Sequence, residues 1–355
     1  MSTAASVVAT TRAAQRIVER GTVRALLSLP DRAKRALAGA PVVLDGQTLD
    51  VSTQLVLRLQ KVSRKKGAEE FPIPEGREVL AEQSALLKGE FALGAVSDTE
   101  AGGVGVRVYV PRELVPSRQR PTLIFIHGGG FIYGAEHSTH DSVCQFLAQR
   151  AGVQVISIDY RLAPEAAFPA AYDDSLAAFR AIVEASQEWR VDTDRIAVGG
   201  DSAGGNLAAA VALAAAREGL PLAFQLLIYP VTDALTRHRS RDLFGQGFFL
   251  TDGFMDMAID SYLPDHALRS DPRVHLIEAE IPDGVAPALL VTAGFDPLRD
   301  EGEAYARRLV DAGVEVELRR ETGLIHGFLN WVGVPCAARD AVTVMAEQLA
   351  AALKR

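Results

Sequence analysis

The segment GGDSAGG (199–205) places a serine between two glycines, Gly200 and Gly204. It follows the apolar run RIAVGG and precedes an alanine-rich stretch, so a strand, a tight turn and a helix are expected in that order. Such a turn raises the serine hydroxyl above a sheet, and the helix N-terminus favours a developing negative charge. We therefore expect Ser202 to be a nucleophile; the alternative is a glycine-rich turn with a solvent-facing hydroxyl.

A second glycine-rich segment, HGGGF (127–131), directly follows the apolar run TLIFI. Backbone N–H groups of Gly128, Gly129 and Gly130, together with that of Ala203, could converge on one oxygen atom and form an oxyanion hole. The sequence does not decide which two of these glycines donate. A flexible loop or a phosphate cradle is the alternative, but the Lys-Ser/Thr pair that a P-loop requires is absent.

A serine nucleophile needs a base, and His326 is the best candidate among the seven histidines. It lies in ETGLIHGF, after a run expected to be a strand, and loops at the carboxyl ends of strands carry the chemistry of α/β enzymes. His127 is expected to brace its own glycine loop. A metal site made of His127, His137 and His140 is strongly disfavoured because no carboxylate or cysteine completes it. Surface positions are expected for His238, His266 and His275.

The imidazole in turn needs an acid that fixes its tautomer. Between Ser202 and His326, Asp296 is the carboxylate that follows a predicted strand, ALLVTAG. Asp300 is the less favoured choice, since it and Glu301 would complement the dipole at the start of the next helix. Asp201 is not expected to take part, because adjacent side chains on a tight turn diverge.

The order of predicted strands and helices supports placing these residues at the ends of strands. Short apolar runs that predict strands alternate with helical patterns, which favours a doubly wound α/β sheet, mostly parallel, with helices on both faces. Strands are predicted at 106–110, 122–127, 153–160, 195–200, 224–229, 288–294 and 314–320, and helices at 141–151, 173–188, 203–217, 301–312 and 338–353. Residues 232–280 interrupt the alternation and are predicted to be a helical insertion.

Composition narrows the class of protein. The formal net charge of −8 argues against a nucleic-acid partner. Two cysteines without metal-site spacing are expected to be packing residues in a reducing compartment, and the absence of a signal sequence or membrane-spanning run predicts a cytoplasmic location. Arg12, Arg16, Arg20 and Arg24 recur every four residues and are expected to form a solvated basic helix face; a membrane-surface role is the less favoured alternative.

The motifs together resemble those of the hormone-sensitive-lipase-like family of α/β-hydrolase esterases. They are HGGGF (127–131), DYRLAPE (159–165), FPAAYDD (168–174), GDSAGG (200–205), DPLRDEG (296–302) and HGF (326–328), in the family's order. The resemblance implies the α/β-hydrolase fold and a carboxylic ester hydrolase without cofactor or metal, acting through Ser202, Asp296 and His326. It also implies a cap over the site, and a homodimer is plausible on the same ground.

The resulting division of the chain assigns 1–90 largely to the cap, 91–231 and 281–355 to the catalytic core, and 232–280 to a cap insertion. Five aromatic residues are candidates to line the substrate pocket, although about half of them are expected to be core residues: Phe131, Tyr133, Phe248, Phe249 and Phe328. A restrictive cap and the lack of a lipid-anchoring segment predict a preference for short to medium acyl esters.

Two other functions remain open at this point. The same site could cleave an amide, an N-formyl or O-acetyl group, or a lactone, because the attack chemistry is shared. A non-catalytic small-molecule receptor on this fold is disfavoured, because such a protein would be expected to lack one of the three candidate catalytic residues.

Overall fold

The computed structural model describes residues 18–64, 66–134 and 139–354, and its centre is an eight-stranded sheet in the order β10-β9-β8-β7-β5-β6-β4-β3. The strands are β3 (Ala95–Ala101), β4 (Val104–Val110), β5 (Arg120–Ile126), β6 (Gln154–Asp159), β7 (Val191–Asp201), β8 (Phe224–Ile228), β9 (Ala288–Phe295) and β10 (Val316–Ile325). From β6 to β10 the neighbouring strands are parallel, whereas β4 pairs antiparallel with both β6 and β3.

All seven predicted strands are present, and the sheet holds one more, β3. The segment AVSDTEA is polar and exposed except at its last residue, so it carries no apolar signal of its own. It forms because it extends β4 into a hairpin, with Ala95 paired to Val110 and Ala101 to Val104. The fully buried β9 shows the opposite pattern, with apolar side chains on both faces, as expected of a strand covered by helices on each side.

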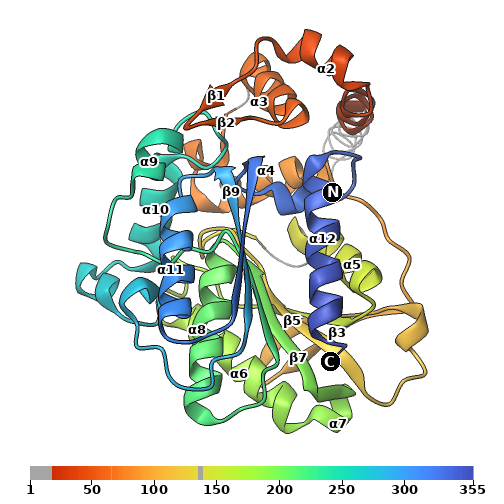
Figure 1. The fold of residues 1–355 in the computed structure, drawn as a ribbon, viewed down its shortest axis with the longest axis vertical. Coiled ribbons are helices and arrows are strands. Elements are labelled where there is room, and N and C mark those ends of the chain that lie inside the picture. Colours follow the sequence, from red (N-terminus) through yellow and green to blue (C-terminus); the bar gives the residue numbers. More distant parts are fainter. Residues whose placement is uncertain (1–17, 65, 135–138, 355) are drawn as a thin grey trace, which may run out of the picture.

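Helices cover both faces of the sheet (Figure 1). One apolar core contains side chains of α6 (Ala170–Glu184), α8 (Ala203–Glu218) and α11 (Arg299–Asp311), and the other contains those of α5 (Asp141–Ala151) and α12 (Ala337–Ala352). The short helix α7 (Ser186–Trp189) and the 3₁₀ turns η2 (Arg112–Leu114) and η6 (Phe328–Trp331) complete this part of the chain. The fold class predicted from the sequence, an α/β fold with a mostly parallel sheet and helices on both faces, is confirmed.

The N-terminal segment lies across the carboxyl ends of the strands, at the top of Figure 1. It comprises α2 (Asp31–Ala38), β1 (Val43–Leu44), β2 (Gln47–Thr48), α3 (Val51–Ser63), η1 (Ala68–Glu70) and α4 (Ile73–Ala85). Two bonds attach it to the sheet: Asp50 N donates to Gly323 O of β10 at 2.9 Å, and Gln47 Nε2 donates to Gly294 O of β9 at 3.1 Å.

Residues 232–280 contain α9 (Arg239–Phe244), α10 (Asp252–Tyr262), η4 (His266–Ser270) and η5 (Leu276–Glu278), in keeping with the helical insertion expected. This insertion contacts the N-terminal segment directly. Arg239 Nη2 lies 2.7 Å from Asp45 Oδ1, and Thr251 Oγ1 donates to Glu69 Oε1 at 3.0 Å. The N-terminal segment and the insertion are therefore in direct contact. Their assignment as one cap stays a prediction.

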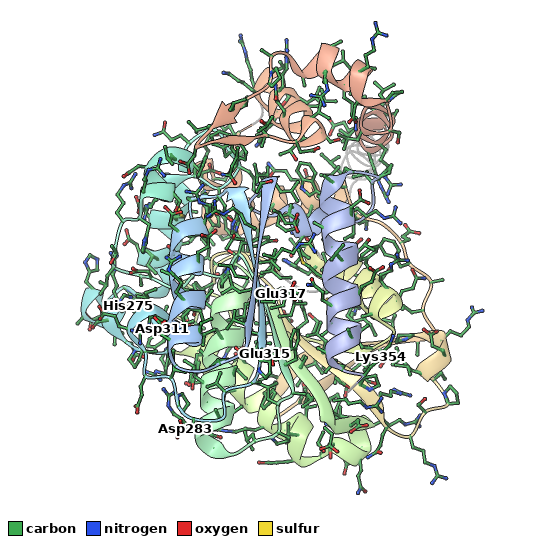
Figure 2. The ribbon with its side chains drawn as sticks, viewed as in Figure 1. His275, Asp283, Asp311, Glu315, Glu317 and Lys354 are labelled. Atoms are coloured by element: carbon green, nitrogen blue, oxygen red, sulfur yellow. The ribbon has the colours of Figure 1, made fainter. Side chains whose placement is uncertain are left out.

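Two surface predictions are wrong. His275, labelled in Figure 2, is buried, and its Nδ1 lies 3.3 Å from Asp233 Oδ1. Arg20 and Arg24 are half-buried rather than solvated: both donate to Lys88 O, at 3.2 and 2.6 Å, and thereby attach the helical residues 18–27 to the body of the protein. Arg12 and Arg16 lie outside the described residues.

None of the helices in the described ranges is both long and apolar enough to cross a lipid bilayer. Cys144 and Cys336 are both buried.

Candidate active site

Ser202 is the first residue after β7 and the last before α8. Its backbone has φ 56° and ψ −120°, a conformation that is rare for a residue with a side chain and concentrates at functional sites. The turn requires glycine on either side, because a Cβ at Gly200 or Gly204 would collide with the carbonyl oxygen of Ile126 on the neighbouring strand. The predicted strand, tight turn and helix are all present here.

The other two candidate residues also follow directly on strand ends. Asp296 comes after Phe295, the last residue of β9, and His326 comes after Ile325, the last residue of β10. Phe295 and Ile325 are paired in the parallel ladder, so the residues that follow them leave the sheet side by side. The register of two strands thus places the acid next to the imidazole.

The three side chains form a continuous hydrogen-bonded chain. His326 Nδ1 lies 2.8 Å from Asp296 Oδ2, and His326 Nε2 lies 2.9 Å from Ser202 Oγ. A carboxylate only accepts hydrogen bonds, so Nδ1 carries the proton and Nε2 is free to accept one from the serine hydroxyl. Asp300 and Glu301 do not contact His326; oxygen atoms of their carboxyl groups accept backbone N–H groups of Ser240 and Thr232 instead.

All three residues are buried, and Asp296 is the most deeply buried of them. Asp296 is 0% exposed, and its Oδ1 accepts the Leu298 N–H at 2.8 Å, so its orientation is fixed. Ser202 and His326 are 8% and 7% exposed. The Asp296 carboxyl group is therefore fully enclosed and held by the Leu298 N–H and by His326 Nδ1, while the other two side chains keep a small exposed fraction.

Tyr229 was not singled out from the sequence, yet it occupies the equivalent position on β8. It is the first residue after that strand, and its ring centroid lies 4.5 Å from that of His326. Burial holds the pKa of Tyr229 well above its ordinary value, so its hydroxyl stays protonated and donates to Asp201 Oδ2 at 3.3 Å. Four consecutive strands of the sheet therefore each contribute their next residue to the site. That shared position is the signal that could have revealed Tyr229.

The glycine loop after β5 lies against this turn. Gly129 and Gly130 have φ of 127° and 64°, which only glycine adopts readily, and the Tyr133 N–H closes the loop on Gly129 O at 2.8 Å. Gly128 differs from them, because its N–H donates to Asp201 Oδ1 at 2.9 Å. Of the three candidate glycine donors, one is therefore already bonded within the protein.

Asp201 is the second residue that sequence reasoning missed. Its side chain points at the glycine loop, where Oδ1 accepts the Gly128 N–H and lies 3.0 Å from His140 Nε2. Burial raises the pKa of Asp201, but His140 and the Gly128 N–H more than offset this and hold the pKa below its usual value. The aspartate thus stays ionised behind the loop.

His127 braces the loop as predicted. Its Nδ1 donates to Gly128 O at 2.9 Å, and its ring stacks on Tyr160 with centroids 4.3 Å apart. Burial lowers the pKa of His127 to about 4, so the imidazole is neutral at physiological pH. His137, one of the three histidines of the disfavoured metal site, lies outside the described residues. Within those residues, no group of three or more His, Cys, Asp or Glu side chains is placed to bind a metal ion.

The five candidate pocket aromatics occupy different environments. Phe131, Tyr133 and Phe328 are buried; Phe131 stacks on Tyr262 with centroids 3.9 Å apart, and Phe328 packs against Tyr229. Phe248 is partly buried between Phe244 and Phe295. Phe249 is 41% exposed, has φ 79°, and its ring lies over Gly327, beside His326. Their role in a pocket stays a prediction.

Comparison with known proteins places this geometry in context. The family described as alpha/beta hydrolase fold matches residues 123–330. Carboxylic ester hydrolase LipN of Mycobacterium tuberculosis is 43% identical over 333 residues, covering 90% of this chain and 88% of that protein. Ethyl acetate hydrolase of Pseudomonas putida is 39% identical over 283 residues, covering 78% and 89%.

Solved structures agree with these relatives. An ester hydrolase from the metagenome of Lake Arreo superposes with a TM-score of 0.80 at 38% identity, covering 85% of this chain and 98% of that one. A thermostable esterase from Pseudomonas putida superposes with a TM-score of 0.79 at 35% identity, covering 85% and 96%. The fold and these likenesses define an enzyme, a serine hydrolase of the carboxylesterase type. The chain belongs to the hormone-sensitive-lipase-like family of α/β hydrolases.

Proposed function

We propose that this enzyme cleaves carboxylic esters by an acyl-enzyme mechanism in which Ser202 is the nucleophile, His326 the general base and acid, and Asp296 the orienting carboxylate. The observation that carries the proposal is the continuous chain from Asp296 Oδ2 through the imidazole to Ser202 Oγ, with contacts of 2.8 and 2.9 Å. Both distances lie within the range needed for proton transfer between a nucleophile and its base.

In the first half-reaction, Ser202 Oγ attacks the ester carbonyl carbon while His326 Nε2 takes the hydroxyl proton. Asp296 accepts the Nδ1–H bond throughout and stabilises the imidazolium without being protonated itself. The tetrahedral intermediate then collapses, the C–O bond to the alcohol breaks, and the alcohol leaves with the proton from Nε2. In the second half-reaction, water loses a proton to His326 Nε2 and attacks the acyl-enzyme carbonyl carbon. The bond from that carbon to Ser202 Oγ then breaks, Oγ takes the proton from Nε2, and the acid is released.

The oxyanion is assigned to the N–H groups of Gly129, Gly130 and Ala203. Gly128 is left out because its N–H already donates to Asp201. Ala203 is the first residue of α8, so its amide has no partner within the helix and the helix dipole adds to its effect. This assignment narrows the three glycines of the sequence prediction to two.

Short to medium acyl chains are the proposed substrates. The N-terminal segment and the insertion meet above the strand ends, and Ser202 remains only 8% exposed beneath them. A relative at 39% identity is named for the hydrolysis of ethyl acetate, whose acyl group has two carbons. A cytoplasmic location and a homodimer remain predictions, and light scattering at micromolar concentration tests the second.

The testing experiment is hydrolysis of nitrophenyl acetate, butyrate, octanoate and palmitate by the wild type, Ser202→Ala and a control variant, Ser270→Ala, whose exposed hydroxyl bonds Ala267 O. The wild type and the control should hydrolyse the short esters, and Ser202→Ala should lose about 10⁴-fold or more in kcat. Circular dichroism should show all three folded. Retained activity in Ser202→Ala would exclude the mechanism, and a rate maximum at palmitate would exclude the acyl preference.

A further inference from the structure

Arg77 of α4 joins three parts of the chain that are far apart in sequence. Its Nε donates to Ile132 O at 2.8 Å, and its Nη2 donates to Ala163 O at 2.9 Å. The same guanidinium binds Glu165 with two parallel bonds of 2.9 and 2.7 Å. A helix of the N-terminal segment is thus bonded to the loop after β5 and to the loop after β6.

The loop after β5 is the one that contains the two glycines assigned to the oxyanion. The Tyr133 N–H bonds Gly129 O at 2.8 Å, so residues 129–133 form one compact turn, and the carbonyl held by Arg77 lies inside it. A second bond, from Ala163 N to Phe131 O at 2.9 Å, joins the turn to the loop after β6. Arg77 joins the same two loops a second time, because it donates to the carbonyl oxygens of Ile132 and Ala163.

A second contact from the N-terminal segment reaches the same turn. The Tyr133 hydroxyl donates to Ala68 O of η1 at 3.1 Å. On the other side of the turn, Asp201 holds the Gly128 N–H. The turn is therefore held at both ends, by the core at Gly128 and by the N-terminal segment at Ile132 and Tyr133.

We propose that Arg77 is a positioning residue that fixes the direction of the Gly129 and Gly130 amides by holding the Ile132 and Ala163 carbonyls, an inference that rests on the proposed function. Amide donors stabilise an oxyanion only if they are preorganised at the place where charge develops. The interaction with Glu165 has a lesser part. Glu165 is 58% exposed, and it serves to orient the guanidinium fork rather than to hold the loop directly.

The proposal separates three variants. Arg77→Ala removes all four bonds, and we expect kcat for nitrophenyl butyrate to fall about 10- to 100-fold with KM nearly unchanged, because the loss is in transition-state stabilisation. Glu165→Ala leaves both carbonyl bonds and should have a much smaller effect. Arg77→Lys keeps the charge but lacks the planar fork, so it should lie between the two.

Controls separate positioning from loss of fold. Arg32→Ala, in α2 of the same segment, removes an exposed arginine without these contacts and should behave as the wild type. Labelling with a fluorophosphonate gives the fraction of active molecules, and kcat is divided by it. Equal losses in Arg77→Ala and Glu165→Ala, or an unchanged kcat in Arg77→Ala, would overturn the proposal.

Hydrogen exchange supplies a readout that does not depend on turnover. Peptides covering 128–134 should exchange faster in Arg77→Ala than in the wild type, while peptides from α12 should not change. If the wild type hydrolysed no ester, the proposed function would fail, and exchange alone would still decide whether Arg77 holds the loop. Unchanged exchange over 128–134 would refute the positioning role even in an active esterase.

Discussion

The strand ends and the segments above them are built by different kinds of contact. Ser202, Tyr229, Asp296 and His326 are each the first residue after a strand, so backbone register alone brings them together. The N-terminal segment and the insertion attach instead through long-range side-chain bonds such as Arg77 to Ile132 O, Gln47 to Gly294 O and Thr251 to Glu69. The first arrangement fixes the reacting atoms, and the second adjusts loops and access around them. Changes at the strand ends should therefore act directly on the chemical step. Changes above them should act on selectivity or stability, and on the chemical step only where they hold the glycine loop, as Arg77 does.

After Ser202→Ala, the largest effect is expected from Asp296→Asn. The amide oxygen can still accept the Leu298 N–H, but the amide NH₂ would then face His326 Nδ1 and force the proton onto Nε2. An imidazole in that tautomer cannot accept the serine proton, so kcat should fall by about 10³- to 10⁴-fold. Stopped-flow or steady-state assays with nitrophenyl butyrate measure it. A loss of only a few-fold would show that the histidine is not oriented by Asp296.

An intermediate effect is expected from Asp201, which belongs to the strand end but acts on the glycine loop. Asp201→Ala removes the acceptor of the Gly128 N–H and should lower kcat by about 10- to 100-fold with little change in KM. Asp201→Asn keeps an acceptor oxygen and should retain most of the activity. Equal losses in the two variants would mean that the charge matters and not the bond to the loop.

A smaller effect, on selectivity, is expected from Phe249 of the insertion. Replacing it with leucine shortens an exposed side chain beside His326 without touching the hydrogen-bonded residues. The ratio of kcat/KM for octanoate and acetate esters should change by about 3- to 10-fold, as expected for a few methylene contacts. The matched control is Leu235→Ala, another exposed apolar residue of the insertion. If Phe249→Leu lowered all esters equally, the insertion would affect the chemical step and the comparison would fail.

The smallest effect on activity, and a clear one on stability, is expected from Glu301→Gln. Burial raises the pKa of Glu301 from 4.5 to about 8 in the folded protein. Between these two values the unfolded chain gives up this proton and the folded protein keeps it, so this group makes stability fall as pH rises. The amide oxygen in the variant would keep the bonds to the Thr232 and Asp233 N–H groups, and the amide does not titrate.

Melting temperatures measured across that pH range should therefore fall less steeply in Glu301→Gln than in the wild type, with activity at neutral pH unchanged. A residual slope of the same sign is expected from His238, because its bond with Asp233 raises its pKa and the stabilising charge is lost at higher pH. Parallel curves for the wild type and the variant would show that Glu301 is ionised in the folded protein.

The sequence predicted what depends on local pattern. The loops carrying Ser202, Asp296 and His326 could be located because each follows a predicted strand, at 195–200, 288–294 and 314–320, and the structure places these three residues in contact. Strand β3 was missed because its residues are polar and it exists only through pairing with β4. A strand of this kind depends on its pairing partner, which the residues of the strand itself do not reveal.

The same limit explains the missed residues near the site. Asp201 was expected to have no role because adjacent side chains on a tight turn diverge, yet the loop after β5 supplies the Gly128 N–H as its partner. Arg77 belongs to no motif, and its three partners lie 55 to 88 positions away in the chain. His275 was expected at the surface because it lies in the insertion, but it is buried with Asp233 beside it. In each case the sequence shows the residue but does not show which distant residue it contacts.

The placement of the lysine side chains has a practical consequence for attaching the enzyme to a surface. Lysine occurs only at positions 34, 61, 65, 66, 88 and 354. Lys354, labelled in Figure 2, lies near Gln119, Pro121 and Arg195 at the amino ends of the strands, opposite to Ser202. The exposed Lys61, Lys66 and Lys88 belong instead to the N-terminal segment above the site. Amine-reactive supports would therefore hold many molecules with the substrate entrance toward the solid, whereas a tether at Lys354 alone would turn every entrance toward the solution.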